Sequence, residues 1–393
     1  MKMNNWNKVA LSEICDLIAG FAFKSKDFGD YDSKVIKITH ITPPSVDMDN
    51  LGGVDISKYN AAKLEKFIAK AGDYVLAMTG ATIGKIGRIE HGSAYINQRV
   101  LLFRPRQNVD KEFLYYALQQ YEFGQYITSH ADSESAQPNI SAGTIGKYQI
   151  ILPPMEIQKR IGTLLRAYDE KRENNRKIND NLEQQAKALV RQYCKKITSS
   201  VELGTILSFE NGFAFQSSSY HEKGKYRIIT IKNVQDGRID SQGASCIDDI
   251  PLRMKKGCIL SIGDVLLSLT GNVGRVGIVC EDNLLLNQRV AKFVPNDIRI
   301  LPLLYFYFRL SSTKKSLETI SKGTAQQNLS PIETLKIEIP YEALQSLELS
   351  NLLQPMFNTI YQKSIENIQL AEIRDSLLPR LISGEVDVSA VKL

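Results

Sequence analysis

Residues Gly72–Ile89 read GDYVLAMTGATIGKIGRI, a stretch in which apolar residues are grouped between glycines. Almost the same string returns at Gly263–Val279 as GDVLLSLTGNVGRVGIV. Apolar, partly β-branched runs on either side of a glycine-rich turn are typical of a β-hairpin. The sequence therefore predicts one hairpin-like unit that occurs twice, far apart, in a chain of 393 residues.

Three further blocks repeat in the same order: GFAFKS (20–25) with GFAFQS (212–217), INQRV (96–100) with LNQRV (286–290), and AQPNIS (136–141) with AQQNLS (325–330). The offset between equivalent residues falls steadily along the chain, from 192 between Phe21 and Phe213 to 188 between Leu182 and Leu370. Chance matches would scatter, whereas a duplicated domain that loses single residues in its loops drifts in this way. We therefore predict two homologous halves.

Each half has the same internal order. A part rich in strand signals, with one helical stretch at 111–127 or 301–320, makes up residues 1–154 and 199–340. A long amphipathic helix follows, within 155–198 in the first half and 341–393 in the second. We predict an α+β fold: two homologous mixed α/β domains separated by two long antiparallel coiled-coil-like helices, with an approximate two-fold axis.

Two details of the long helices are expected from proline and polar residues. Pro355 lies inside the apolar pattern, so we expect a short helix before it and the long helix to begin at it. Asn175 and Lys363 are equivalent positions in the apolar seam, where polar residues often fix the register of a helix pair.

Signals for catalysis, metal binding or membrane insertion are missing from the sequence. The glycines around Lys85 fail the spacing of a phosphate-binding loop, and no nucleophile elbow or dinucleotide-binding loop is found. The five cysteines and four histidines show no metal-ligand spacing. No apolar run of about 18 residues and no signal peptide is present. We expect a soluble, cytoplasmic, non-catalytic protein with no metal.

A duplicated domain suits a ligand that itself repeats along its length, and duplex DNA is such a ligand. A net charge of +6 is compatible with nucleic acid but does not decide the question. The alternative is a DNA-independent coiled-coil scaffold that holds two protein partners.

The blocks TGATIGKIG, NQRV, SAQPNIS and LPPMEIQKRI, with the ending EIRDSLLPRLISGEVDV, resemble the specificity subunit of type I restriction-modification systems over essentially the whole chain. The resemblance implies two target recognition domains that each read half of a bipartite, asymmetric site in double-stranded DNA, with the long helices as a ruler for the spacer. It also implies two modification subunits that bind S-adenosylmethionine and methylate adenine, and two optional restriction subunits that use ATP and Mg. A recognition subunit of a methylation-only or other defence complex is the nearest alternative.

The helices of that family also dock the modification subunits. The candidate docking residues on this reading are Ile161, Leu165, Tyr168, Leu182, Leu189, Leu353, Ile360, Leu370 and Leu377.

Comparing the halves divides the candidate DNA-contacting residues. Residues identical in both halves are framework or backbone contacts: their glycines permit positive φ, and Arg99 pairs with a buried carboxylate. In the alternative, the glycines allow close approach of phosphate, and the equivalent residues Lys85 and Arg275 supply charge. Lys24 and Gln216 are equivalent but differ in type, so they are candidates for base reading. Phe21 and Phe213, with the second phenylalanine of each block, are core residues.

The full candidate set is Lys24, Thr79, Lys85, Arg88, Gln98, Arg99, Gln137, Asn139, Gln216, Thr270, Arg275, Gln288, Arg289, Gln326, Gln327 and Asn328. The amides near 137 and 327 either contact DNA or cap turns. Segments 40–60 and 231–249 have no clear counterpart in the other half, so we expect differences in specificity there.

Overall fold

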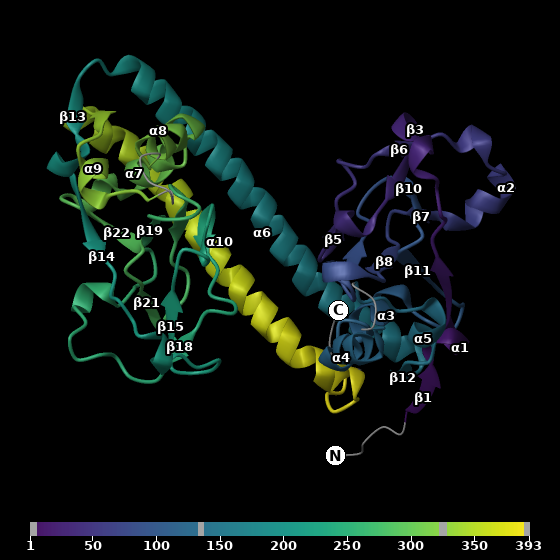
Figure 1. Ribbon diagram of the computed structural model, residues 1–393. Coiled ribbons are helices and arrows are strands. Elements are labelled where there is room, and N and C mark those ends of the chain that lie inside the picture. Colours follow the sequence, from purple (N-terminus) through teal and green to yellow (C-terminus); the bar gives the residue numbers. More distant parts are fainter. Residues whose placement is uncertain (1–5, 133–136, 322–327, 389–393) are drawn as a thin grey trace. The chain divides into compact units, whose positions relative to one another are not determined.

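The computed structural model describes residues 6–132, 137–321 and 328–388. Its contacts divide the chain into two units (Figure 1). Unit 1 comprises Met1–Glu170 and Ala371–Leu393, and unit 2 comprises Lys171–Leu370. Both units mix sheets and helices, as the sequence predicts.

The main sheet has six strands in each unit, and their order is the same. In unit 1 the order is β2 (Cys15–Ala19), β11 (Val100–Pro105), β8 (Tyr74–Ala77), β9 (Ile86–Arg88), β5 (Ser45–Val46) and β4 (Ile41–Thr42). In unit 2 it is β14 (Leu207–Asn211), β22 (Val290–Pro295), β19 (Val265–Ser268), β20 (Val276–Ile278), β17 (Gly237–Ile239) and β16 (Val234–Gln235). The duplication inferred from the sequence therefore extends to the topology.

The smaller sheets are similar but not identical. Unit 1 has β6 (Gly53–Val54), β3 (Phe28–Ile36), β10 (Ser93–Ile96) and β7 (Ile68–Lys70), while unit 2 has β18 (Cys246–Ile247), β15 (Tyr226–Ile229) and β21 (Leu284–Leu286). Each unit also pairs its first and last strands, β1 (Asn7–Ala10) with β12 (Gln149–Leu152) and β13 (Ser200–Glu202) with β23 (Glu338–Pro340). Short helices complete the units: α1 (Leu11–Ile14), α2 (Ala61–Leu64), α5 (Ala142–Gly146) and α9 (Pro331–Leu335).

The stretch Gly72–Ile89 forms the antiparallel hairpin β8–β9, in which Val75 lies opposite Gly87. Its copy forms β19–β20. Each connecting loop contains two glycines with φ between +70° and +80°, at equivalent positions: Gly80 and Gly84, Gly271 and Gly274. A side chain is disfavoured at such φ values, which explains why these four glycines recur.

The central strand β8 is apolar on both faces because each face meets a different core. Tyr74 and Leu76 pack into one cluster with the helices of the unit, and Val75 and Ala77 pack into another between the sheets. Such double burial produces a continuous apolar run rather than polar–apolar alternation.

The helical stretch expected at 111–127 is two helices, α3 (Lys111–Ala117) and α4 (Tyr121–His130); its copy is α7 (Leu301–Phe308) and α8 (Ser311–Ser321). The expected helical stretch is therefore present in both halves, divided into two helices. In one straight helix Phe113 and Ile127 would lie about 21 Å apart along the axis. The break between α3 and α4 allows both side chains to enter the same core cluster.

The two long helices are α6 (Met155–Lys196) and α10 (Ala343–Ile382). The expectation that α10 would begin at Pro355 is wrong, since the helix continues through this residue. Proline cannot donate to the carbonyl of Asn351, but Asn351 and Pro355 are both exposed, so water can bind that carbonyl. No helix in the described part of the chain is both long and apolar enough to cross a membrane.

Within unit 2, α6 and α10 are antiparallel and share a polar layer. Asn175, which is 1% exposed, donates from Nδ2 to Glu366 Oε2 at 2.9 Å and to Asn367 Oδ1 at 3.0 Å. Lys363 Nζ donates to Asn175 Oδ1 at 3.2 Å. The two polar positions singled out in the sequence are thus bonded directly to each other, as a register-fixing pair requires.

Candidate nucleic-acid interface

Three segments of unit 1 are joined into what we call loop cluster 1: Met78–Gly80, Asn97–Arg99 and Pro138–Ile140. The N–H of Met78 donates to Arg99 O at 2.9 Å, and that of Ile140 donates to Met78 O at 3.0 Å. Thr79 Oγ1 and the N–H of Gly80 both donate to Pro138 O at 3.0 Å. The hairpin loop, the NQR turn and the amide-containing loop are therefore one backbone-bonded surface.

Unit 2 repeats this arrangement as loop cluster 2, made of Leu269–Gly271, Asn287–Arg289 and Asn328–Leu329. The N–H of Leu269 donates to Arg289 O at 3.1 Å, and that of Leu329 donates to Leu269 O at 2.7 Å. Thr270 and Asn328 form the same isolated bridge that Thr79 and Asn139 form in unit 1.

Repeated glycines allow the close approach of backbone that both clusters need. A Cβ on Gly20 would lie 2.2 Å from Asn97 O, and one on Gly212 would lie 2.1 Å from Asn287 O. A Cβ on Gly277 would lie 2.5 Å from Arg238 O on the neighbouring strand. These repeated glycines are thus required by the framework.

The candidate residues are placed unequally. Those exposed on the surface are Lys24, Lys85, Gln98, Arg99, Gln137, Gln216, Gln288, Arg289 and Asn328. Asn139 is half-buried, and Thr79 is only 7% exposed. Thr270 is half-buried, and its Oγ1 has no partner among the described residues. Gln326 and Gln327 lie outside the described residues.

Two of the candidate arginines are held by protein partners. Arg88 is 15% exposed and donates to Glu112 at 3.1 Å and 2.8 Å through its two terminal nitrogens. Arg275 is half-buried and donates from Nη1 to Gln235 Oε1 at 2.7 Å. A DNA contact by Arg88 would require breaking a bidentate ion pair, so its placement favours a role within the framework.

Arg99 pairs differently from the expectation of a buried carboxylate. Its side chain is exposed, and Nη1 donates to the amide oxygen of Asn139 at 3.1 Å. An amide does not neutralise a charge, and no ion pair of Arg99 with another described residue is found.

The blocks after Gly20 and Gly212 also have equivalent local structure. Lys24 and Gln216 each precede a 3₁₀ turn, η1 (Ser25–Asp27) and η7 (Ser217–Ser219), and both side chains are exposed. The phenylalanines Phe23 and Phe215 are buried in small aromatic cores, with Phe21 and Phe213 packed against them.

The segments that lack a counterpart by sequence share a turn in the structure. The N–H of Lys37 donates to His40 Nδ1 at 3.0 Å, and that of Thr230 donates to Asn233 Oδ1 at 2.9 Å. Burial lowers the pKa of His40, which keeps Nδ1 free to accept. Sequence comparison missed the equivalence of His40 and Asn233 because two different residue types accept the same hydrogen bond.

The packing corrects the expected docking residues of the long helices. Ile161 and Leu165 lie in the core of unit 1, and Leu353 and Ile360 lie in the core of unit 2, all at most 4% exposed. Their apolar pattern reflects packing within this chain, which favours a role in the core for these four. The others are half-buried: Tyr168, Leu182, Leu189, Leu370 and Leu377.

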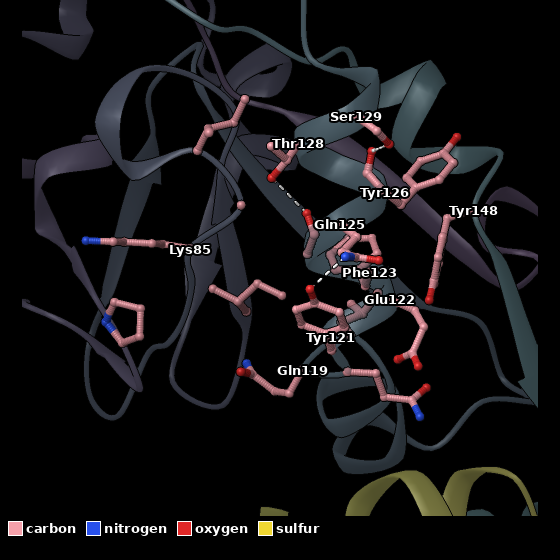
Figure 2. Close-up of a pocket in the computed structure, with 17 residues that line it drawn as sticks. Lys85, Gln119, Tyr121, Glu122, Phe123, Gln125, Tyr126, Thr128, Ser129 and Tyr148 are labelled. Atoms are coloured by element: carbon pink, nitrogen blue, oxygen red, sulfur yellow. Dashed lines mark hydrogen bonds between the residues drawn. The ribbon is translucent and has the colours of Figure 1, made fainter. Parts of the chain in front are cut away.

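A hollow of about 1120 Å³ lies beside α4 in unit 1 (Figure 2). Tyr121, which is 74% exposed, and Gln125 line it and are bonded at 2.7 Å, while Lys85 lies on the hairpin side. The equivalents of Tyr121 and Gln125 in the repeat, Ser311 and Lys315, carry different chemistry. The side chains that line this hollow therefore differ from those at the equivalent positions of unit 2.

Ligands for a metal ion are not grouped in the described residues, where no three His, Cys, Asp or Glu side chains lie suitably together. The cysteines are free thiols, four of them buried. Burial raises the pKa of Cys15 and of Cys280 to about 12, so neither is a reactive thiolate.

Comparisons with known proteins agree with this geometry. The family model described as type I restriction modification DNA specificity domain matches residues 3–184 and again residues 198–369. The type I restriction enzyme MjaIX specificity subunit of Methanocaldococcus jannaschii is 26% identical over 341 residues, 80% of this chain and 78% of the relative. The EcoBI specificity subunit of Escherichia coli is 23% identical over 427 residues, 98% of this chain and 86% of the relative.

A solved structure shows the same fold. The crystal structure of a type I restriction-modification S subunit from M. genitalium matches with a TM-score of 0.58 at 18% identity, covering 97% of this chain and 98% of that one. Two family matches that together span most of the chain, with topology that repeats in the same order, lead to one conclusion: the chain belongs to the type I restriction-modification DNA specificity domain family and contains two copies of that domain.

Proposed function

We propose that this chain is the DNA sequence-specificity subunit of a type I restriction-modification complex. Each unit reads one half of a bipartite, asymmetric site in double-stranded DNA, and the long helices set the spacing between the halves. The chain is non-catalytic and presents the site to other subunits in the cytoplasm.

One observation carries this proposal: the same loop framework occurs twice with different side chains on it. Lys24 in unit 1 corresponds to Gln216 in unit 2, and Lys85 corresponds to Arg275. Loop clusters 1 and 2 have the same pattern of internal backbone hydrogen bonds. Each unit therefore presents its side chains on the same type of scaffold. A common scaffold with exchanged side chains is what reading two different half-sites requires.

The partners follow from the same proposal. Two modification subunits bind S-adenosylmethionine and methylate adenine within the site. Two restriction subunits, which use ATP and Mg, join this complex when cleavage accompanies methylation. The exposed apolar residues on the long helices, Leu344 at 76%, Leu352 at 63% and Ile373 at 43%, are better candidates for subunit contacts than the buried ones.

The experiment is modified-base sequencing of DNA from cells that express the chain with its candidate methyltransferase, compared with cells that lack only this chain. Loss of adenine methylation at one split motif would establish the recognition role and give the motif. An unchanged pattern with an active methyltransferase would refute the role and favour a scaffold. Cleavage of unmodified DNA by the full complex would distinguish a restriction system from a methylation-only one.

A further inference from the structure

A second hollow, of about 520 Å³, lies in unit 2 beside loop cluster 2. Tyr220 and three segments supply its walls: the turn 230–233, the loop 240–245 and the NQR turn. Its lining includes two cations and one carboxylate, Lys232, Arg289 and Asp240. The net charge of these side chains is positive, so the hollow suits a ligand rich in acceptor atoms.

The walls are held in place by Asn233, which is 6% exposed. Its Oδ1 accepts from the N–H of Thr230 at 2.9 Å and from Thr230 Oγ1 at 2.8 Å, and its Nδ2 donates to Asp240 O at 2.9 Å. Asp240 Oδ1 in turn accepts from the N–H of Gln242 at 3.1 Å. The turn 230–233 and the loop 240–245 are thus joined through one buried amide, so these two walls of the hollow are preformed.

Arg289 and Arg99 occupy the same place in the repeated NQR turn but have different surroundings. Arg99 is tied to Asn139 by a hydrogen bond of 3.1 Å. The guanidinium of Arg289 is exposed, lines the hollow, and has no partner among the described residues. An identical residue is therefore available for ligand binding in unit 2 and engaged in unit 1.

We propose that Arg289 reads a guanine in the second half-site, with the hollow receiving the edge of that base. Guanine presents O6 and N7 as adjacent acceptors in the major groove, and the planar fork of arginine donates to both. Lys232, exposed on the opposite segment, contacts the neighbouring phosphate as a point charge. The inference rests on the proposed function and names one base contact within it.

The test is selection from a pool of randomised duplex DNA by the full-length chain, at one fixed salt concentration. Arg289→Ala should reduce the preference for guanine at one position of one half-site by about 10-fold or more and leave the other half-site unchanged. Arg289→Lys keeps the charge but not the fork, so it should lose the same preference with a smaller loss of affinity. Lys232→Ala should weaken binding to all sequences alike and lower the salt slope by about 1.

Arg253→Ala is the control, since it removes an exposed arginine of unit 2 that lies outside the hollow and outside both loop clusters, and it should change no base preference. Equal thermal unfolding midpoints would show that the variants are folded. The inference is overturned if Arg289→Ala weakens all sequences evenly, which is the behaviour of a phosphate contact, or if it changes both half-sites. A wild-type chain that selects no motif would instead overturn the proposed function.

Discussion

Glu183 on α6 holds a buried arginine of unit 2, and its removal gives a sharp prediction. Arg309 is 8% exposed; its Nε donates to Glu183 Oε1 at 3.1 Å, and its Nη2 donates to the same oxygen. Its Nη1 donates to Val276 O at 3.2 Å, on strand β20 of the repeated hairpin. Glu183 thus neutralises the cation that connects the long helix to this hairpin.

Glu183→Ala leaves the guanidinium buried with one carbonyl and with Asp236 at 4.0 Å. Breaking a buried ion pair from one side costs about 3–5 kcal/mol, and the remaining carboxylate favours the lower end, about 3 kcal/mol. For a unit the size of Lys171–Leu370 this corresponds to a melting temperature lower by about 6–12 °C.

Thermal unfolding gives the total loss, and hydrogen exchange at the β19–β20 amides assigns it to unit 2. The double variant Glu183→Gln with Arg309→Met should recover most of the stability, because no unpaired charge remains. Lys187→Ala, which removes only the half-exposed i,i+4 partner of Glu183, is the control and should cost about 0.5 kcal/mol. A loss of stability below about 1 kcal/mol for Glu183→Ala would refute the reasoning. So would a double variant whose loss equals the summed losses of Glu183→Gln and Arg309→Met measured singly.

Three further predictions concern the framework. Gly274→Ala should lower the free energy of unfolding by about 1–2 kcal/mol in a denaturant titration, because φ is +79° and the new Cβ would lie 3.3 Å from Leu317 Cδ1 on α8. Gly52→Ala is the control and should cost far less, because a Cβ there would have no atom within 4 Å. The hydroxyl of Tyr59 donates to Asp27 and holds the pKa of this carboxyl below its usual value of 3.8. The bond therefore stabilises the folded chain above pH 3.8, and this stabilisation is lost as the pH falls through the lowered pKa. Asp27→Asn should therefore flatten the acid limb of an unfolding titration, and an unchanged limb would count against the bond. Burial raises the pKa of Cys280 to about 12, so this thiol should resist a thiol reagent at about pH 8 until the chain unfolds; mass spectrometry that finds it labelled in the folded chain would contradict its burial.

The duplication and the strand content of the fold were predictable, because glycines with positive φ and doubly buried strands leave direct traces in the sequence. The break between α3 and α4 was not predictable from periodicity. In α3 five consecutive residues from Phe113 are buried, whereas α4 buries only Phe123 and Ile127, and the break lets Phe113 and Ile127 share one core cluster. The effect of Pro355 was mispredicted for a similar reason. Proline leaves the carbonyl of Asn351 without its helical donor, and only the packing shows that Asn351 is exposed, so that water can bind this carbonyl.

The candidate interface was predictable as a set of segments but not as a set of partners. The NQR turn, the hairpin loop and the amide-containing loop were all candidate segments, but that they meet is seen only in their backbone hydrogen bonds. Residues identical in the two halves were assigned the same role. The guanidinium of Arg99, however, donates to Asn139, whereas that of Arg289 has no partner among the described residues. Conversely, His40 and Asn233 look unrelated and accept the same backbone bond.

The composition of unit 1 has a consequence for how the chain is made. Its core includes Leu378, Leu381 and Val388, which follow Glu170 only after all of unit 2. At about 5–20 residues per second, a ribosome needs roughly 10–40 s to add the 200 residues from Lys171 to Leu370. Throughout that interval the first-made part of the chain exposes apolar surface that only the last-made part can cover. Unit 2 can therefore be complete while unit 1 still lacks the core residues that follow Leu370.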